Sequence, residues 1–238
     1  MVQVKTFDIS CSGYQLKADF YQGSKPNKIL LSLIGWTSSR TKYKDILSGM
    51  VDQTGMSALV FDYSGHGDSL FDVADTRPAQ HFLEVICVFD WIIEKYPEAE
   101  ITVMGTSYGG FMATQLVKYR EFKNLILRVP AIYRPQDFYD HPGVWAHTEV
   151  TNELRVDQDA LRSHPLLKRA SKFSGNALVV VHNQDEHVPV RTTDAYVSAF
   201  GADVLAFDAK HSPVDKSAEW KAEYQKQISD WLKPKIVQ

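Results

Sequence analysis

The pentapeptide Gly105-Thr106-Ser107-Tyr108-Gly109 places one serine between two glycines. An apolar run at residues 101–104 precedes it, and apolar residues at helical spacing follow it over residues 111–117. A serine on a tight turn between a strand and a helix has its hydroxyl exposed, and the flanking glycines leave room for the backbone. The short pattern also occurs by chance, but its context favours Ser107 as an activated nucleophile.

A serine hydroxyl is a weak nucleophile unless a base takes its proton and a further group orients that base. Two later segments supply these residue types. Asp185 follows the apolar run 177–182, and His211 follows the apolar run 204–207. If both runs are parallel strands, the two side chains lie on the same edge of the sheet as Ser107.

Apolar runs alternate with helical patterns along most of the chain. Alternation of polar and apolar residues predicts an antiparallel hairpin, and nearly continuous apolar runs predict buried strands. Strands alternating with helices predict a three-layer α/β/α sandwich around a mostly parallel sheet of about eight strands. The expected strands are 2–9, 14–21, 29–34, 58–62, 101–104, 125–130, 177–182 and 204–207, and the expected helices are 42–51, 78–96, 111–117, 191–200 and 217–232.

The alternation breaks at residues 131–174, which contain three prolines and several aromatic residues. This segment is too long for an ordinary connection in a compact domain. We expect a single domain over residues 1–238, with this segment inserted as a small cap above the strand ends, where open α/β sheets bind ligands. The cap aromatics could simply bury the cap on the core, but some should line a substrate pocket. The expected pocket residues are Trp36, Tyr133, Phe138, Tyr139, Trp145 and Val188.

The composition of the 238 residues is that of a globular protein, with 44% hydrophobic and 23% charged residues. A net charge of -3 without a basic cluster argues against a nucleic-acid partner. No apolar stretch approaches the roughly 20 residues that span a membrane, so we expect a soluble, cytoplasmic protein. Cys11 and Cys87 are too few for a disulfide framework and are expected to be plain thiols.

The order serine, aspartate, histidine along the chain resembles the α/β-hydrolase superfamily. The resemblance covers nearly the whole chain and also rests on Val188-Pro189 after the aspartate and on the turn 64–69. It implies Ser107 as the nucleophile and His211 as general base and then acid. It implies Asp185 as the carboxylate that orients His211 and stabilises its charged form.

Family position also implies an oxyanion hole formed by the backbone amides of Trp36 and Tyr108. Many relatives have His-Gly at the first of these turns, whereas Ile34-Gly35 stands here, and the glycine run of lipases is missing. Backbone donors do not depend on side-chain identity, so we expect the hole to be retained.

Other residues could take part in such a site. Asp208 and Asp137 are alternative candidates for the acid, although Asp185 is favoured. His66, between two glycines, is more typical of a structural histidine than of a base. The spacing of His182 and His187 does not match a zinc motif, so no metal site is expected.

Within the superfamily, the short cap and compact length look most like small carboxylesterases of the cinnamoyl or feruloyl type and like acyl thioesterases. We therefore expect hydrolysis of an ester or thioester of an apolar or aromatic acyl group through an acyl-enzyme, with a small-molecule substrate and no cofactor. The alternatives are an acyltransferase or a peptidase of the prolyl-oligopeptidase clan, a biosynthetic lyase or cyclase that uses the triad as a base, and a non-catalytic ligand-binding protein.

Overall fold

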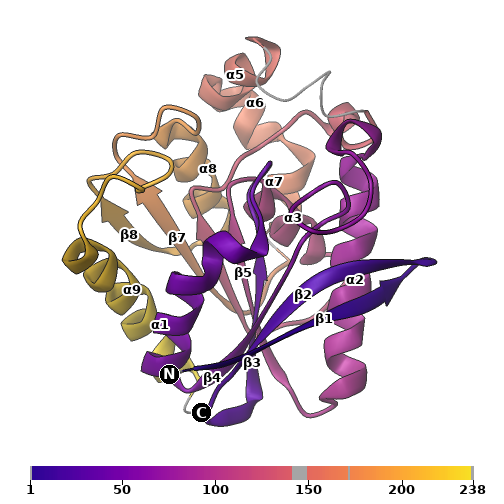
Figure 1. The fold of residues 1–238 in the computed structure, drawn as a ribbon. Coiled ribbons are helices and arrows are strands. Elements are labelled where there is room, and N and C mark those ends of the chain that lie inside the picture. The colour runs from indigo at the N-terminus through magenta and orange to yellow at the C-terminus, as the bar shows by residue number, and fades with distance from the viewer. Residues whose placement is uncertain (1, 141–148, 171, 237–238) are drawn as a thin grey trace.

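The computed structural model describes residues 2–140, 149–170 and 172–236. Eight strands form one sheet in the order β1-β2-β4-β3-β5-β6-β7-β8 (Figure 1). The strands are β1 (Gln3–Cys11), β2 (Tyr14–Gln22), β3 (Lys25–Leu33), β4 (Met56–Phe61), β5 (Glu100–Thr106), β6 (Asn124–Arg128), β7 (Asn176–His182) and β8 (Asp203–Phe207). This sheet confirms the predicted fold class and strand number.

The sheet is antiparallel at one end and parallel elsewhere. β1 pairs with β2, and β2 pairs with β4, in antiparallel register, whereas all pairs from β4 to β8 are parallel. Every residue of β4 and β6 is buried, which explains why residues 58–61 of β4 and 125–127 of β6 are continuous apolar runs rather than alternating ones. The parallel strands end at one edge, where the loops that carry the candidate site residues begin.

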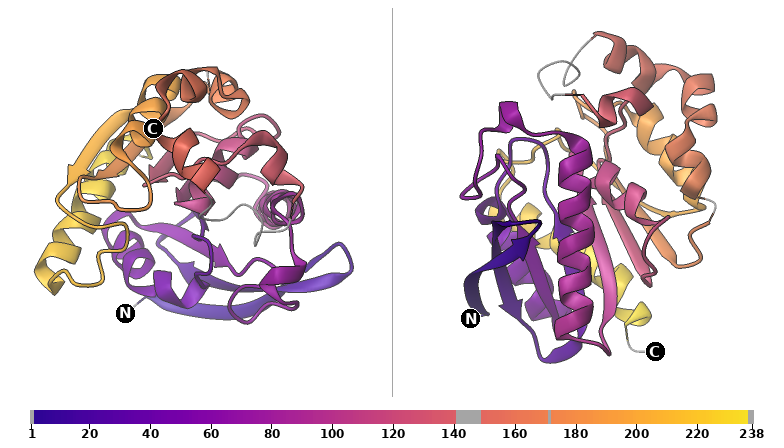
Figure 2. Two further views of the ribbon diagram at one scale, coloured as in Figure 1. Left: turned by 90° about the horizontal axis from the view of Figure 1, so that it is seen from above. Right: turned by 90° about the vertical axis from the view of Figure 1, so that its right-hand side faces the viewer.

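Helices cover both faces of the sheet. α1 (Lys44–Thr54) packs on α9 (Ala218–Leu232), while α2 (Pro78–Lys95) packs on α3 (Tyr108–Leu116) on the opposite face (Figure 2). α8 (Val190–Phe200) packs on β7. The short 3₁₀ helices are η1 (Arg40–Tyr43), η2 (Val73–Asp75), η3 (Pro135–Phe138) and η4 (Lys233–Lys235).

Helix boundaries follow local chemistry. α2 has Pro78 in its first turn, where the missing amide costs nothing, and it ends before Pro97. α1 runs three residues beyond the predicted end and stops at Gly55, which adopts a left-handed conformation with φ of 75°. The predicted strand 125–130 ends at Arg128, because Val129 turns to a positive φ of 41°.

The segment between β6 and β7 is partly helical in its described residues. It contains η3 and the helices α5 (Glu149–Val156), α6 (Gln158–Ser163) and α7 (Pro165–Ala170). α5 and α6 lie above the carboxyl ends of the parallel strands (Figure 1). This is the place expected for the inserted cap, whose boundaries at 131 and 174 stay a prediction. In the part of the chain that the structure describes, no helix is long and apolar enough to cross a membrane.

Candidate active site

The turn between β5 and α3 holds Ser107 in an unusual backbone conformation, with φ of 53° and ψ of -113°. Such a conformation is strained for a residue with a side chain and persists only when its surroundings fix it. The Ser107 amide donates to the Arg128 carbonyl at 2.9 Å, and the Ser107 carbonyl accepts the amide of Ala131 at 3.0 Å. The end of β6 therefore holds the turn in place.

The two glycines of the pentapeptide are required by close packing. A Cβ on Gly105 would lie 2.3 Å from the carbonyl oxygen of Gly109, and a Cβ on Gly109 would lie 2.1 Å from that of Leu33. Real Cβ atoms do not approach that closely, so α3 can start next to β3 and β5 only with glycine at both positions.

The structure brings together Ser107, His211 and Asp185. His211 Nε2 lies 3.0 Å from Ser107 Oγ, and His211 Nδ1 lies 2.7 Å from Asp185 Oδ2. With the carboxylate facing Nδ1, the proton is assigned to Nδ1, so Nε2 can accept the serine hydroxyl. A hydroxyl in this position can lose its proton to the imidazole as it attacks an electrophile.

The carboxylate of Asp185 is buried and well hydrogen-bonded. Its second oxygen, Oδ1, accepts the amides of His187 at 2.8 Å and of Val188 at 2.7 Å. Burial alone would raise the pKa of Asp185, but the hydrogen bond and charge of His211, together with the two amides, outweigh it and hold that pKa below its usual range. Asp185 is therefore ionised beside His211 at neutral pH.

The two alternative carboxylates make other contacts. Asp208 accepts a hydrogen bond from the side chain of Gln184 at 2.6 Å. Asp137 is buried and paired with the guanidinium of Arg134 at 2.6 Å. The geometry therefore favours Asp185 over both as the partner of His211.

The histidines around the site have different surroundings. His182 is buried between the Lys210 carbonyl, at 2.7 Å, and the Tyr224 hydroxyl, at 3.2 Å. Burial lowers the pKa of His182 to about 4, so this side chain is neutral and braces the loop just before His211. The exposed His187 meets the His211 ring edge-on, with 5.2 Å between the ring centroids. Among the described residues, no group of three or more histidine, cysteine or acidic side chains could hold a metal ion.

Of the two predicted oxyanion-hole residues, Tyr108 directly follows Ser107, and Trp36 follows Gly35, which lies beside the serine. A Cβ on Gly35 would lie 3.8 Å from Ser107 Cβ, so the Gly35-Trp36 turn passes directly beside the serine. Tyr108 is the first residue of α3, and amides in the first turn of a helix point out of its end, where they favour negative charge. Both amides are thus positioned on turns that adjoin the serine.

Behind the site lies a buried cluster that sequence reasoning missed. The hydroxyl of Tyr108 lies 2.8 Å from His81 Nδ1, while His81 Nε2 lies 3.0 Å from the Ser64 carbonyl. Burial lowers the pKa of His81 to about 3, which keeps it neutral. His66 Nδ1 also reaches the Ser64 carbonyl, at 3.1 Å, consistent with the structural role expected for His66. The Tyr108 side chain is fully buried in this cluster. It therefore lines no open pocket.

The residues predicted for the substrate pocket do not form one group. Three of them, Tyr133, Phe138 and Tyr139, line a cavity of about 360 Å³ together with aromatic residues of α2 and α3. Trp36 and Val188 are not among the residues that line it. Val188 is buried in the core, and the Trp36 ring packs against the rings of His66 and Tyr108. Trp145 lies outside the described residues.

Arg155 was also missed by sequence reasoning. It lies buried in α5, where Nη1 donates to the His187 carbonyl at 2.9 Å and Nε donates to the Ile132 carbonyl at 3.3 Å. Its guanidinium also lies over the Tyr133 ring, 5.1 Å from the centroid. Arg155 thus links the segment above the sheet to the loop that carries Asp185.

Known proteins resemble this chain in sequence and in fold. A family model described as "Serine aminopeptidase, S33" matches residues 24–203, a range that includes Ser107 and Asp185 and ends before His211. Protein ABHD12B of Homo sapiens is 25% identical over 171 residues, which are 67% of this chain and 46% of that protein. The chain thus spans about half the length of this relative.

Two esterase structures share the fold over nearly the whole chain. The Pyrococcus furiosus esterase Pf2001 has a TM-score of 0.72 at 19% identity, covering 98% of this chain and 93% of that one. Est1E from Butyrivibrio proteoclasticus, solved with ferulic acid bound, has a TM-score of 0.76 at 17% identity, covering 98% and 100%. The family match, together with the sheet described above, establishes that the chain belongs to the serine aminopeptidase S33 family of serine hydrolases and has the α/β-hydrolase fold.

Proposed function

We propose that this protein hydrolyses carboxylic esters or thioesters through an acyl-enzyme on Ser107. The observation that carries the proposal is the continuous line of hydrogen bonds, 3.0 Å from Ser107 Oγ to His211 Nε2 and 2.7 Å from His211 Nδ1 to Asp185. Ser107 Oγ attacks the carbonyl carbon of the substrate while His211 Nε2 takes the hydroxyl proton. Asp185 stabilises the imidazolium that forms.

The remaining steps use the same groups. The amides of Trp36 and Tyr108 bind the oxygen of the tetrahedral intermediate, and loss of one such donor costs about 3 kcal/mol of transition-state stabilisation. The alcohol or thiol leaves with the proton from His211. Water then attacks the acyl-enzyme, with its proton passing to His211, and the free acid and the serine hydroxyl are restored.

The cavity lined by aromatic residues supports an apolar or aromatic acyl group. Phe111 and Tyr133 both line it. Phe111 lies one helical turn beyond Ser107 in α3, and Tyr133 lies two residues beyond Ala131, whose amide donates to the Ser107 carbonyl. Neither Ser107 nor His211 is among its lining residues, so the link between this cavity and the nucleophile rests on these two neighbours, and the aromatic rings favour burial of a planar or branched acyl chain. Such a chain would place its carbonyl at Ser107 and its tail toward Phe138.

A second candidate is an aminopeptidase activity, as the family description suggests. One observation favours it: the half-exposed carboxylate of Glu186 lies 3.4 Å from the His211 amide. A carboxylate beside the base could bind the α-ammonium group of a peptide. The Ser107 mechanism would then release an amine instead of an alcohol.

A panel of substrates tests the two candidates. p-Nitrophenyl butyrate, methyl ferulate, butyryl thioester and an aminoacyl p-nitroanilide are offered to the wild type, to Ser107→Ala and to the matched surface variant Ser10→Ala. We expect ester or thioester hydrolysis by the wild type and by Ser10→Ala, and a loss of at least about 10⁴-fold in Ser107→Ala. Turnover of the anilide alone would contradict the esterase proposal, and unchanged turnover by Ser107→Ala would contradict the mechanism.

A further inference from the structure

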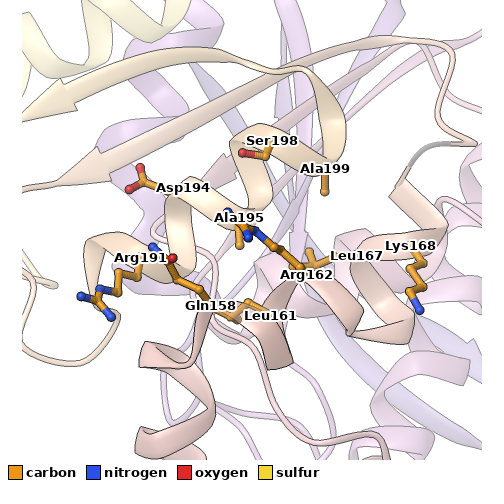
Figure 3. Close-up of a pocket in the computed structure, with 10 residues that line it drawn as sticks. All are labelled: Gln158, Leu161, Arg162, Leu167, Lys168, Arg191, Asp194, Ala195, Ser198 and Ala199. Carbon is orange, nitrogen blue, oxygen red and sulfur yellow. The ribbon is translucent and has the colours of Figure 1, made fainter.

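A second hollow lies between the helices α6, α7 and α8 (Figure 3). Its volume is about 450 Å³, within the range of about 300–1,000 Å³ typical of small-molecule sites. Neither Ser107 nor His211 is among the residues that line it. The hollow is therefore separate from the site at which the hydrolysis is proposed.

Small side chains on α8 create this space. Ala195 and Ala199 are one helical turn apart, so they lie on the same face of α8, and both line the hollow. Opposite them, Leu161 of α6 and Leu167 of α7 are only 1% and 4% exposed and provide apolar walls. Larger residues at the two alanine positions would fill the space. The small size of the alanines therefore keeps this apolar floor open.

Positive charge surrounds this apolar floor. Arg162, Lys168 and Arg191 line the hollow, against a single carboxylate, Asp194. The lining therefore carries a formal charge of +2, three positive less one negative, on a chain whose net charge is -3. The positive electrostatic potential of this lining attracts an anion. Guanidinium groups bind carboxylates with paired hydrogen bonds.

Within the described part of the chain, the two arginines make a weak ion pair and one hydrogen bond. Arg162 lies 4.0 Å from Asp159, with side chains that are 76% and 96% exposed, so water screens this ion pair. Arg191 donates Nη1 to the Val156 carbonyl at 3.1 Å, and a guanidinium has five donor hydrogens. In Figure 3 the Arg162 side chain extends from α6 in the direction of Ala195 on α8.

We propose that this hollow is a second ligand site, for a small amphipathic carboxylate such as a medium-chain fatty acid. The hydrocarbon tail packs on the half-buried Ala195 and Ala199 of α8, beside the almost fully buried Leu161 and Leu167. The carboxylate lies at the rim and binds the guanidinium of Arg162. The proposal stands on this hollow alone and does not depend on the reaction proposed at Ser107.

Isothermal titration calorimetry with decanoate, below its micelle concentration, tests the site on the full chain. Ala195→Leu fills the floor, and Ala160→Leu makes the same change on α6 outside the lining. Arg162→Gln removes the charge at the rim, and Arg120→Gln is its control on a distant surface. Thermal unfolding of each variant checks that it is folded, and the arginine variants serve if Ala195→Leu does not fold.

We expect one decanoate per chain, with a Kd raised about tenfold or more in Ala195→Leu and Arg162→Gln and unchanged in both controls. Decyltrimethylammonium, with the same tail and the opposite charge, should bind at least about tenfold more weakly. The absence of decanoate binding, or wild-type affinity in both folded test variants, would overturn the proposal. The second result would place decanoate elsewhere, for example in the cavity lined by Phe111 and Tyr133.

Discussion

Replacing Asp185 by asparagine should reduce kcat by about 10⁴-fold while leaving the fold intact. In the wild type, Oδ1 accepts two amides, at 2.8 Å from His187 and 2.7 Å from Val188, and Oδ2 faces His211 Nδ1 at 2.7 Å. An asparagine side chain has one oxygen and one NH₂ group for these three donors. Its orientation decides what happens to His211.

The orientation follows from the cost of unpaired donors. Turning the NH₂ group toward the two amides would leave both without an acceptor, at about 1–3 kcal/mol each. The amide oxygen therefore stays on the His187 and Val188 amides, and the NH₂ group faces His211 Nδ1. That nitrogen must then accept, so the proton moves to Nε2 and the base can no longer take the proton of Ser107.

The expected loss combines the wrong tautomer with the loss of the charge that stabilises the imidazolium. A factor of about 10⁴ corresponds to about 5.5 kcal/mol in the activation free energy. Steady-state kinetics with p-nitrophenyl butyrate measures this loss as a fall in kcat. KM should change only a few-fold, because the substitution does not alter the cavity proposed to bind the acyl group. Circular dichroism checks the fold.

The matched control is Asp208→Asn. It makes the same chemical change at a carboxylate that accepts a hydrogen bond from Gln184. We expect this variant to keep wild-type kcat within about twofold, because surface substitutions away from special contacts have small effects. If Asp185→Asn kept more than a tenth of the wild-type kcat, or if Asp208→Asn lost it instead, the role proposed for Asp185 would be wrong.

Three further variants address the surroundings of the site. The pKa of His81, lowered to about 3 by burial from a value of 6.5, makes folding less favourable as pH falls below 6.5, since the unfolded chain takes up the proton first. At pH 5 this effect lowers the free energy of unfolding by about 2 kcal/mol. The free energy of unfolding in urea should therefore change less between pH 5 and pH 7 in His81→Gln than in the wild type. An equal change in both proteins would refute a neutral, buried His81. Tyr108→Phe should cost about 1–3 kcal/mol of stability by removing the donor to His81, measured by the same unfolding, and a neutral effect would contradict the buried hydrogen bond. Gly109→Ala should destabilise by about 3 kcal/mol or more, because its Cβ would lie 2.1 Å from the Leu33 carbonyl oxygen, and a stable variant would show that α3 can shift. Its control is Gly201→Ala, where φ of 57° strains the backbone but nothing lies within 4 Å of the added Cβ, so only about 1 kcal/mol is expected.

Outside residues 131–174, the sequence predicted the order of the strands and main helices because each of them has a local pattern. Continuous apolar runs mark the buried parallel strands, and the turn types after β5, β7 and β8 mark where Ser107, Asp185 and His211 lie. Topology brings them to one edge, since parallel strands present their carboxyl ends there, and the resemblance in residue order singled out Asp185 and His211 among the candidates. This is why the sequence links residues as far apart as Ser107 and His211.

Side-chain surroundings could not be predicted in the same way. The partners of Tyr108 and Arg155 are set by how α2 packs on α3 and how α5 packs above the sheet, and neither arrangement has a local pattern. For the same reason, the residues predicted to line one pocket lie in different surroundings. Tyr133 faces a cavity, whereas Val188 points into the core, and both are equally apolar in sequence.

Labelling with a fluorophosphonate probe, followed by mass spectrometry of the peptides, tests the central claim most directly. The hydrogen-bonded line from Asp185 to Ser107 should activate that hydroxyl above every other in the chain. We predict one phosphonyl group per chain, on the peptide that contains Ser107, and no labelling of Ser107→Ala. Label on another residue, or equal labelling of Ser107→Ala, would contradict the proposal that Ser107 is the nucleophile.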